Sequence, residues 1–442
     1  MNRIFKRSTA IILTAILTLS LSACSNQNAE SDESSQNSTQ SSVQQSSETS
    51  PTESSKSESS KSESSEQESS EQESSYTESS ESESSTEESS ETETVMPTEW
   101  QDNGIFSEYY DEAYDIVKEM TLDEKIGQML FARCPSENAA EIAAEYHIGG
   151  YVLFGQDFKN KTTEEVIANI TSYKYSQDIP MVIATDEEGG TVVRVSSNEQ
   201  LADYKFSSPR EIYANGGMDA IKSEEQKKAE LLSSLLIDTN FAPVCDISVN
   251  SSDFMYDRSL GEDAQTTAEF VSEVTKISQS NGVSATLKHF PGYGNNVDTH
   301  TGIAIDERSY ETFENNDFIP FKAGIDSGAH LVMVSHNIVN CMDSTKPASI
   351  SANVHDILRN ELGFTGIIVT DDLEMDAIKK YTGEYTPAVT AVLAGNDMLT
   401  VTNIENSVSE IRQAVNDGII DESTIDHAVM RILAWKYSKG MI

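Results

Sequence analysis

The chain has 442 residues, and its 74 acidic against 30 basic side chains give a formal net charge of −44 at pH 7. An excess of negative charge on this scale argues against nucleic acid and other polyanions as partners. Four widely spaced cysteines form neither a disulfide framework nor a zinc-binding pattern, so we expect Cys134, Cys245 and Cys341 to be small buried side chains.

The chain begins with the pattern of a secretory signal peptide over residues 1–23. A basic leader, MNRIFKR, precedes the apolar run IILTAILTLSLSA, which is too short for a stable membrane span. The ending Leu-Ser-Ala-Cys at 21–24 resembles the lipobox of bacterial lipoproteins. That resemblance implies cleavage before Cys24, lipid attachment to Cys24, and anchoring to the outer face of the cell membrane. The alternative is an ordinary signal peptide followed by a chance cysteine.

Residues 24–96 are a low-complexity segment composed mostly of Ser, Glu, Gln and Thr, with repeats such as SSEQESSEQESS. Such a segment buries too little apolar surface to offset its chain entropy, so we expect it to be disordered. Its like charges keep it extended. We interpret it as an acidic tether between the membrane and the folded part, with an adhesive segment as the alternative.

From residue 97 to 442, short apolar runs alternate with amphipathic stretches of helical period. The apolar runs occupy 127–133, 149–155, 180–186, 240–246, 284–290, 330–336, 366–372 and 396–401. Eight buried strands, each followed by a helix, predict one α/β domain folded as a parallel (β/α)₈ barrel (a TIM barrel). An open doubly wound sheet is the alternative, although no dinucleotide-binding fingerprint accompanies it.

Ionisable side chains close five of these runs, where the carboxyl ends of barrel strands usually carry the chemistry. They are Asp186, Asp246, the pair Lys288-His289, His336, and the pair Asp371-Asp372. One such aspartate is often only a helix cap, and a strand-end histidine such as His336 is as often structural. Five together favour a site. Carboxylates and imidazoles suit glycoside chemistry, in which carboxylates stabilise a cationic sugar.

Several motifs resemble family 3 glycoside hydrolases in their β-N-acetylglucosaminidase branch. They are KHFPGYGNNVDTH (288–300), TDEEGGTVVR (185–194), YDRSLG (256–261), KPASIS (346–351) and GIIVTDDLEM (366–375). The resemblance implies a retaining β-N-acetylhexosaminidase that needs no cofactor or metal and acts on terminal β-N-acetylglucosamine. With the exported location, it suggests peptidoglycan fragments as the carbohydrate substrate.

The resemblance also implies roles for individual residues. Asp371 would be the nucleophile and His300 the general acid/base, oriented by Asp298. The sugar would be held by Asp186, Arg194, Arg258, Lys288 and His289. A structural ion pair with the adjacent Asp257 is the alternative for Arg258.

Three positions depart from the family pattern and bear on sugar specificity and rate. Tyr293 stands where a histidine is usual, Thr191 where an arginine is frequent, and Thr370 where a serine precedes the nucleophile. Four other functions stay open: a phosphorylase, another family 3 β-glycosidase specificity, a sugar-binding lipoprotein without turnover, and a metal-dependent barrel hydrolase. The last usually needs His-x-His near the first strand, where this chain has FARCP.

Overall fold

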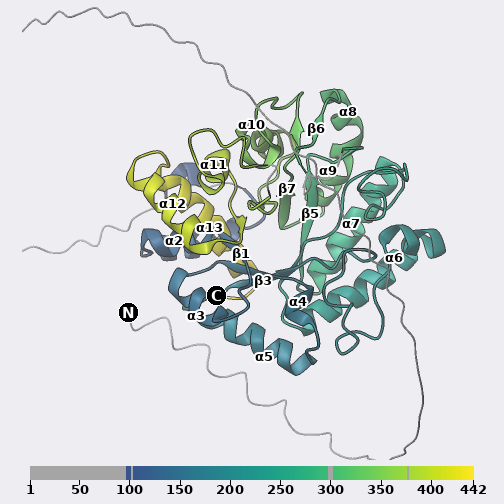
Figure 1. Ribbon diagram of the computed structural model, residues 1–442, viewed down its shortest axis with the longest axis horizontal. Helices are drawn as coiled ribbons and strands as arrows, with labels where there is room; N and C mark the ends of the chain where they lie inside the picture. Colours follow the sequence, from purple (N-terminus) through teal and green to yellow (C-terminus); the bar gives the residue numbers. More distant parts are fainter. Residues whose placement is uncertain (1–95, 101–102, 297–301, 376–377) are drawn as a thin grey trace, which may run out of the picture. The chain divides into compact units, whose positions relative to one another are not determined.

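The computed structural model describes residues 96–442, apart from 101–102, 297–301 and 376–377 (Figure 1). The predicted signal peptide, Cys24 and all but the last residue of the tether therefore lie outside the described residues, as do the predicted catalytic residues Asp298 and His300. Among the helices that are described, none combines the length and the apolar character of a membrane span.

Eight parallel strands form the barrel at the centre of Figure 1, in the order β10-β1-β2-β3-β4-β5-β7-β9. Their bounds are β1 Leu130–Arg133, β2 Gly150–Leu153, β3 Val182–Thr185, β4 Thr239–Asn240, β5 Ser284–Phe290, β7 Leu331–Val334, β9 Ile367–Thr370 and β10 Leu399–Val401. A parallel bridge between Val369 and Met398 joins β9 to β10 and closes the ring. The predicted barrel is confirmed, and the open sheet is excluded.

The Thr370 and Thr400 side chains strengthen this closure. The Thr400 amide donates to Thr370 Oγ1 at 2.9 Å, and Thr400 Oγ1 donates to the Thr370 carbonyl at 2.9 Å. Thr370 is fully buried. The departure from serine at this position therefore adds a methyl group inside the barrel wall and leaves the hydroxyl hydrogen-bonded.

Helices surround the barrel on its outer side (Figure 1). Their bounds are α1 Tyr110–Val117, α2 Leu122–Gln128, α3 Ala139–Tyr146, α4 Gly155–Phe158, α5 Thr163–Lys174, α6 Pro209–Ser234, α7 Ala264–Ser280, α8 Tyr310–Thr312, α9 Phe318–Asp326, α10 Ala352–Asp356, α11 Pro387–Ala394, α12 Ile404–Asn416 and α13 Glu422–Ser438. Short 3₁₀ or π turns cover Thr98–Trp100, Ser107–Tyr109, Phe313–Asp317, Ala348–Ile350 and Ile357–Glu361. Capping boxes open α2, α5 and α6, where a Ser or Thr and a Glu three residues later satisfy the first amides.

A second, two-stranded sheet pairs β6 (Ile305–Asp306) with β8 (Ile338–Val339). Beside it, the Arg308 guanidinium binds the carboxylates of Asp306 and Asp317 at 2.8 Å and donates to the Gly292 carbonyl at 3.3 Å. Gly292 has φ +122°, and a Cβ there would lie 2.4 Å from Asp317 Oδ1, so only glycine fits. Arg308 thus fastens both ends of the loop that follows β5.

The three cysteines outside the predicted leader do not share one environment. Cys134 and Cys245 are buried, as predicted. Cys341 is exposed, so the prediction is wrong there. The reason is local: it lies in the turn after β8, where the Met342 amide bonds back to the Val339 carbonyl.

Helix α13 packs against the strand starts and buries Trp435 and Lys436 completely. The Trp435 indole donates to Ser284 Oγ at 3.2 Å, and Lys436 Nζ donates to Gln128 Oε1 at 2.6 Å. Burial lowers the pKa of Lys436 to about 7, with the positive charge of Lys174 adding to the effect and Asp238 opposing it.

This buried amine gives the first testable prediction. Between pH 10 and pH 7, Lys436 is mostly protonated in the unfolded chain and mostly neutral in the folded chain. The contribution of Lys436 to the free energy of unfolding therefore falls as the pH falls. The free energy of unfolding should drop by up to about 1.4 kcal/mol per pH unit in this window. Lys436→Met should lack that component. Urea unfolding of both proteins at pH 7, 8 and 9 measures the difference, and parallel pH profiles would contradict it.

Candidate active site

The carboxyl ends of the strands surround a cavity of about 480 Å³. All six described residues predicted to act on substrate line it, namely Asp186, Arg194, Arg258, Lys288, His289 and Asp371. Its volume lies in the range typical of small-ligand sites. The predicted site is therefore one place in the fold, although its residues come from segments far apart in the sequence.

Four charged side chains on one side of the cavity form a compact cluster. Lys288 Nζ lies 2.8 Å from Asp186 Oδ1 and 2.6 Å from Glu188 Oε1. Arg258 binds the Glu188 carboxylate through two nitrogens, at 2.6 and 2.9 Å. Lys288 and Glu188 are almost fully buried. The alternative for Arg258, a structural ion pair, is therefore observed, although the partner is Glu188 and not the adjacent Asp257.

The charges of this cluster support one another. Burial alone would raise the pKa of Glu188, but Arg258 and Lys288 outweigh it and hold that pKa far below its usual range. Burial would lower the pKa of Arg258, and Glu188 more than offsets this and raises it. Glu188 is therefore ionised, and it fixes two cationic donors at the cavity wall, where sugar hydroxyls can accept from them.

Hydrogen bonds fix the tautomer of His289. Its Nδ1 lies 2.7 Å from Asp246 Oδ2, and Arg258 Nη2 lies 3.2 Å from its Nε2. Arginine can only donate, so Nε2 accepts, and Nδ1 carries the proton donated to Asp246. Asp246 also accepts from the His289 amide at 3.1 Å and from the Tyr293 amide at 2.7 Å. It is a buried residue that positions the start of the loop after β5.

Asp371 follows the last residue of β9 directly. Its amide donates to the Val334 carbonyl of β7 at 3.1 Å, so its backbone extends the barrel ladder. Its Oδ1 accepts from the Asp372 amide at 2.9 Å. A partly exposed carboxylate fixed in this way at the cavity is well placed to attack a bound sugar.

The loop after β3 is held by Glu187 rather than by Glu188. The buried Glu187 carboxylate accepts from the Arg194 and Val195 amides at 2.7 Å and from the Ser196 amide at 3.2 Å. Arg194 is thereby carried to the cavity, 3.9 Å from Asp186. Its Nε is buried and has no hydrogen-bond partner among the described residues.

The other departures from the family pattern lie at or beside the cavity. Thr191 is exposed and lines it. Tyr293 is buried, and its ring packs edge-on against His289, with centroids 5.7 Å apart. Tyr293 therefore packs against His289, and Thr191 contributes a short side chain to the cavity lining.

His336 does not belong to the cavity. It is fully buried, with Nδ1 2.7 Å from Ser349 Oγ and Nε2 2.9 Å from the Asp372 carbonyl. It therefore supports the segment after β9, which agrees with the structural alternative stated for it. Among the described residues, no three His, Cys, Asp or Glu side chains are grouped so as to hold a metal ion.

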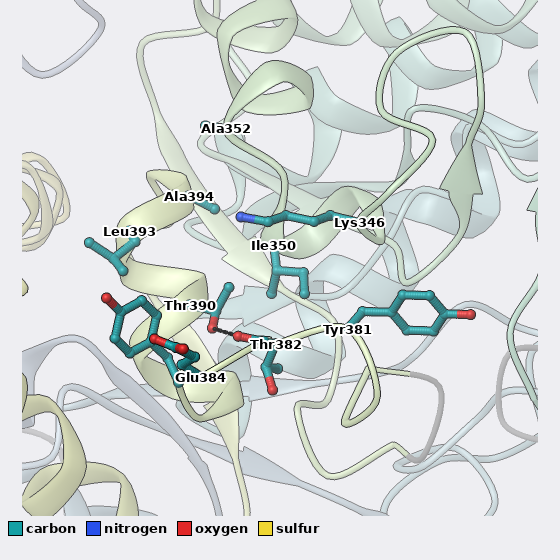
Figure 2. Close-up of a pocket in the computed structure, with 11 residues that line it drawn as sticks. Lys346, Ile350, Ala352, Tyr381, Thr382, Glu384, Thr390, Leu393 and Ala394 are labelled. Carbon is teal, nitrogen blue, oxygen red and sulfur yellow. Dashed lines mark hydrogen bonds between the residues drawn. The ribbon is translucent and has the colours of Figure 1, made fainter. Parts of the chain in front are cut away.

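A smaller cavity, of about 270 Å³, is lined by the segment after β8, the stretch before α11 and α11 itself (Figure 2). Figure 2 shows the Lys346 side chain extending across it above Ile350, with Glu384 on the opposite side. The Thr390 hydroxyl donates within it to the Thr382 carbonyl at 3.4 Å. None of the predicted site residues lines this cavity. We therefore place the active site in the larger one.

The chain is similar to several known proteins. Residues 121–435 match the family model described as the glycosyl hydrolase family 3 N terminal domain. A beta-hexosaminidase of Nitrosomonas eutropha is 30% identical over 291 residues, which cover 63% of this chain and 81% of that protein. A beta-N-acetylglucosaminidase/beta-glucosidase of Cellulomonas fimi is 27% identical over 340 residues, covering 73% of this chain and 58% of that protein.

Solved structures are similar as well. A family 3 beta-N-acetylglucosaminidase from Paenibacillus sp. str. FPU-7 superposes with a TM-score of 0.67 and 31% identity. The superposition covers 73% of this chain and 63% of that one. This chain thus spans less than two thirds of the Paenibacillus protein.

Proposed function

Since this chain belongs to glycosyl hydrolase family 3, we propose that it is a retaining β-N-acetylhexosaminidase that removes terminal β-N-acetylglucosamine. One observation carries the proposal: the Asp371 carboxylate shares a cavity with the cluster of Asp186, Glu188, Arg258 and Lys288. A nucleophilic carboxylate beside paired donors and acceptors suits a polar, uncharged ring. The names of the similar proteins support the choice of sugar.

In the first chemical step, an Asp371 oxygen forms a bond to the anomeric carbon as the bond to the leaving oxygen breaks. The His300 imidazolium, stabilised by Asp298, donates its proton to that oxygen and becomes neutral. In the second step His300 accepts a proton from water, whose oxygen displaces Asp371. Asp186, Lys288, Arg258 and Arg194 hold the ring through both steps, because each presents a charged donor or acceptor at the cavity.

The leaving group that we propose is part of a peptidoglycan fragment, and the place of action is the outer face of the cell membrane. The support for both comes from the sequence: an export signal, the Leu-Ser-Ala-Cys ending before Cys24, and an acidic spacer. A tethered exo-glycosidase would meet cell-wall fragments as they are released.

A fluorinated glycosyl donor tests the covalent intermediate. It should form a sugar ester that turns over slowly, and digestion followed by mass spectrometry should place the label on the peptide that contains Asp371. The matched Asp371→Asn protein should remain unlabelled. Label on another carboxylate, or no label on an enzyme that cleaves a chromogenic N-acetylglucosaminide, contradicts the mechanism.

Phosphorolysis is a second candidate, because the cavity is lined by four cations, Arg133, Arg194, Arg258 and Lys288. A neutral histidine as acid/base does not repel phosphate as a carboxylate would. Rates measured with and without phosphate, together with a search for a sugar phosphate among the products, separate the two reactions.

A further inference from the structure

A buried ion pair on α6 contacts the backbone of the charged cluster and takes no part in the proposed mechanism. Lys228 Nζ lies 3.1 Å from Glu225 Oε2, and the exposed fractions of the two side chains are 7% and 5%. The two residues are three positions apart, so they lie on one face of the helix. Lys228 Nζ also donates to the Glu188 carbonyl oxygen at 3.2 Å. The pair thus joins α6 to the residue that holds two cations of the active site.

The ion pair is itself held from two sides. Glu225 Oε1 accepts from the hydroxyl of Ser278, a buried residue of α7. The Lys228 ammonium lies 5.9 Å from the centre of the Phe206 ring, within the range of a cation–π contact. The Phe206 carbonyl accepts from the Gly190 amide at 2.9 Å. Lys228 is therefore fixed between the helix layer and the loop that follows β3.

The peptide unit between Glu188 and Gly189 needs such a restraint. Gly189 and Gly190 have φ of +104° and +64°, and glycine tolerates φ of either sign, so this unit could turn over. Two hydrogen bonds oppose that rotation. The Gly189 amide donates to the Val192 carbonyl at 3.1 Å, and the Glu188 carbonyl accepts from Lys228. A charged donor makes a stronger hydrogen bond than a neutral one, so Lys228 supplies a large part of the restraint.

The position of this peptide matters because the Glu188 carboxylate makes three short contacts. Arg258 binds it at 2.6 and 2.9 Å, and Lys288 binds it at 2.6 Å. If Glu188 moved away by about 1 Å, these contacts would exceed hydrogen-bonding distance. A misplacement of that size in an active site can cost about 10²-fold in activity. Lys228 therefore acts on the substrate-binding cations through Glu188.

Stability alone does not explain why α6 carries a buried ion pair here. Both charges lose their hydration on burial, and replacing such a pair by apolar residues of similar volume is often neutral or stabilising. Apolar residues would, however, remove this donor from the carbonyl of Glu188, which is almost fully buried. The charged pair differs from an apolar one in what it does for Glu188.

We propose that Lys228 is a positioning residue of the active site. Through the Glu188 carbonyl, Lys228 holds the Glu188 carboxylate within reach of the two cations of the cluster. The inference rests on the proposed glycosidase function, because it takes the cluster to bind the sugar. It extends the machinery of that reaction from the cavity wall to the helix layer outside the barrel.

Two variants separate positioning from stability. Lys228→Met leaves Glu225 buried and unpaired, so it should lower the urea midpoint and also raise KM for a chromogenic N-acetylglucosaminide about tenfold. Lys228→Met combined with Glu225→Gln removes the unpaired charge, so it should regain most of the stability and keep the raised KM. The kcat of both should change by less than about threefold, because the cluster holds the ring in the ground state and the transition state alike. Urea unfolding and steady-state kinetics on folded protein measure these effects.

Lys174→Met is the matched control. The Lys174 side chain is 9% exposed and pairs with Asp238 at 2.7 Å, and Lys174 does not line the cavity. Its replacement should lower stability and keep the native KM. Lys228→Arg retains a charged donor and should recover part of the rise in KM. A native KM in Lys228→Met, or a native KM in the double variant, overturns the proposal. If Lys228→Met does not fold, the double variant alone decides.

A crystal structure of the double variant tests the proposal without catalysis. We expect the peptide between Glu188 and Gly189 to turn or shift, and the Glu188 carboxylate to lose at least one of its three contacts in the cluster. An unchanged peptide with unchanged contacts refutes the positioning role, whatever the activity. If the native protein cleaves no N-acetylglucosaminide, the proposed function fails, and the comparison of the two structures still decides the role of Lys228.

Discussion

Replacement of Asp371 by alanine is expected to lower kcat/KM by at least about 10⁴-fold on a neutral aryl N-acetylglucosaminide, because it removes the carboxylate proposed to form the sugar ester. The fold should be retained, since the Asp371 amide, not its side chain, bonds to β7. Added azide should occupy the vacated space, restore part of the activity and give the α-glycosyl azide. Steady-state kinetics and product analysis measure both effects.

Asp372→Ala is the matched control, because it removes the adjacent carboxylate from the same cavity. The Asp372 carboxylate accepts from the Glu374 amide at 3.0 Å, so its loss should loosen the segment after β9 rather than remove a reacting group. The loss of kcat/KM in Asp372→Ala should be smaller than in Asp371→Ala, and azide should not restore activity. If Asp372→Ala proves the more damaging variant, or if Asp371→Ala retains activity within tenfold of native, the assignment of the nucleophile is wrong.

Removal of the Glu188 carboxylate should damage both stability and activity. Glu188→Ala leaves Arg258 and Lys288 as neighbouring buried cations without their shared partner. Breaking a buried ion pair from one side costs about 3–5 kcal/mol. Displacement of two substrate donors should lower kcat/KM by about 10²-fold. Urea unfolding and kinetics on the folded protein measure the two effects.

A double variant shows whether charge is the cause. Glu188→Ala combined with Arg258→Met removes one unpaired cation, so it should recover part of the lost stability but none of the lost activity. The stability and the activity of Glu188→Gln should lie between those of the native protein and those of Glu188→Ala. If Glu188→Ala unfolds at the same urea concentration as the native protein, the cluster does not act as a set of mutually supporting charges.

The barrel was predictable because its strands are buried on both faces and read as continuous apolar runs. Each of the eight predicted runs contains or overlaps an observed strand. The fourth deviates most: the run at 240–246 yields only Thr239–Asn240 as a regular strand. Pro243 lacks an amide to donate to the ladder, which resumes where the Cys245 amide donates to Lys288.

The site was predictable where a strand end or a family motif marked it. The five predicted substrate-binding residues and Asp371 all line the cavity. Glu188 was missed because Glu187 beside it is chemically identical in the sequence. Only the fold separates their tasks: Glu187 binds amides within its own loop, and Glu188 meets Arg258, 70 residues away. The Asp-x-Glu-Gly-Gly segment was the available signal.

Asp246 shows a further limit. Asp246 was noted as a strand-end acid, but its role depends on contact with His289, 43 residues later. Contacts between separate segments are not encoded in local pattern, which is why tertiary structure was needed to find this role.

The contacts of the Arg308 guanidinium with Gly292, Asp306 and Asp317 bear on how this enzyme can change over evolution. Gly292 and Asp306 both contact the Arg308 guanidinium, so the two ends of the stretch between them are held at one place. A few residues gained or lost between two ends held in this way add little entropy cost. The stretch that carries the proposed proton donor could therefore be exchanged as a cassette, and lineages could acquire new leaving-group preferences while inheriting an unaltered scaffold.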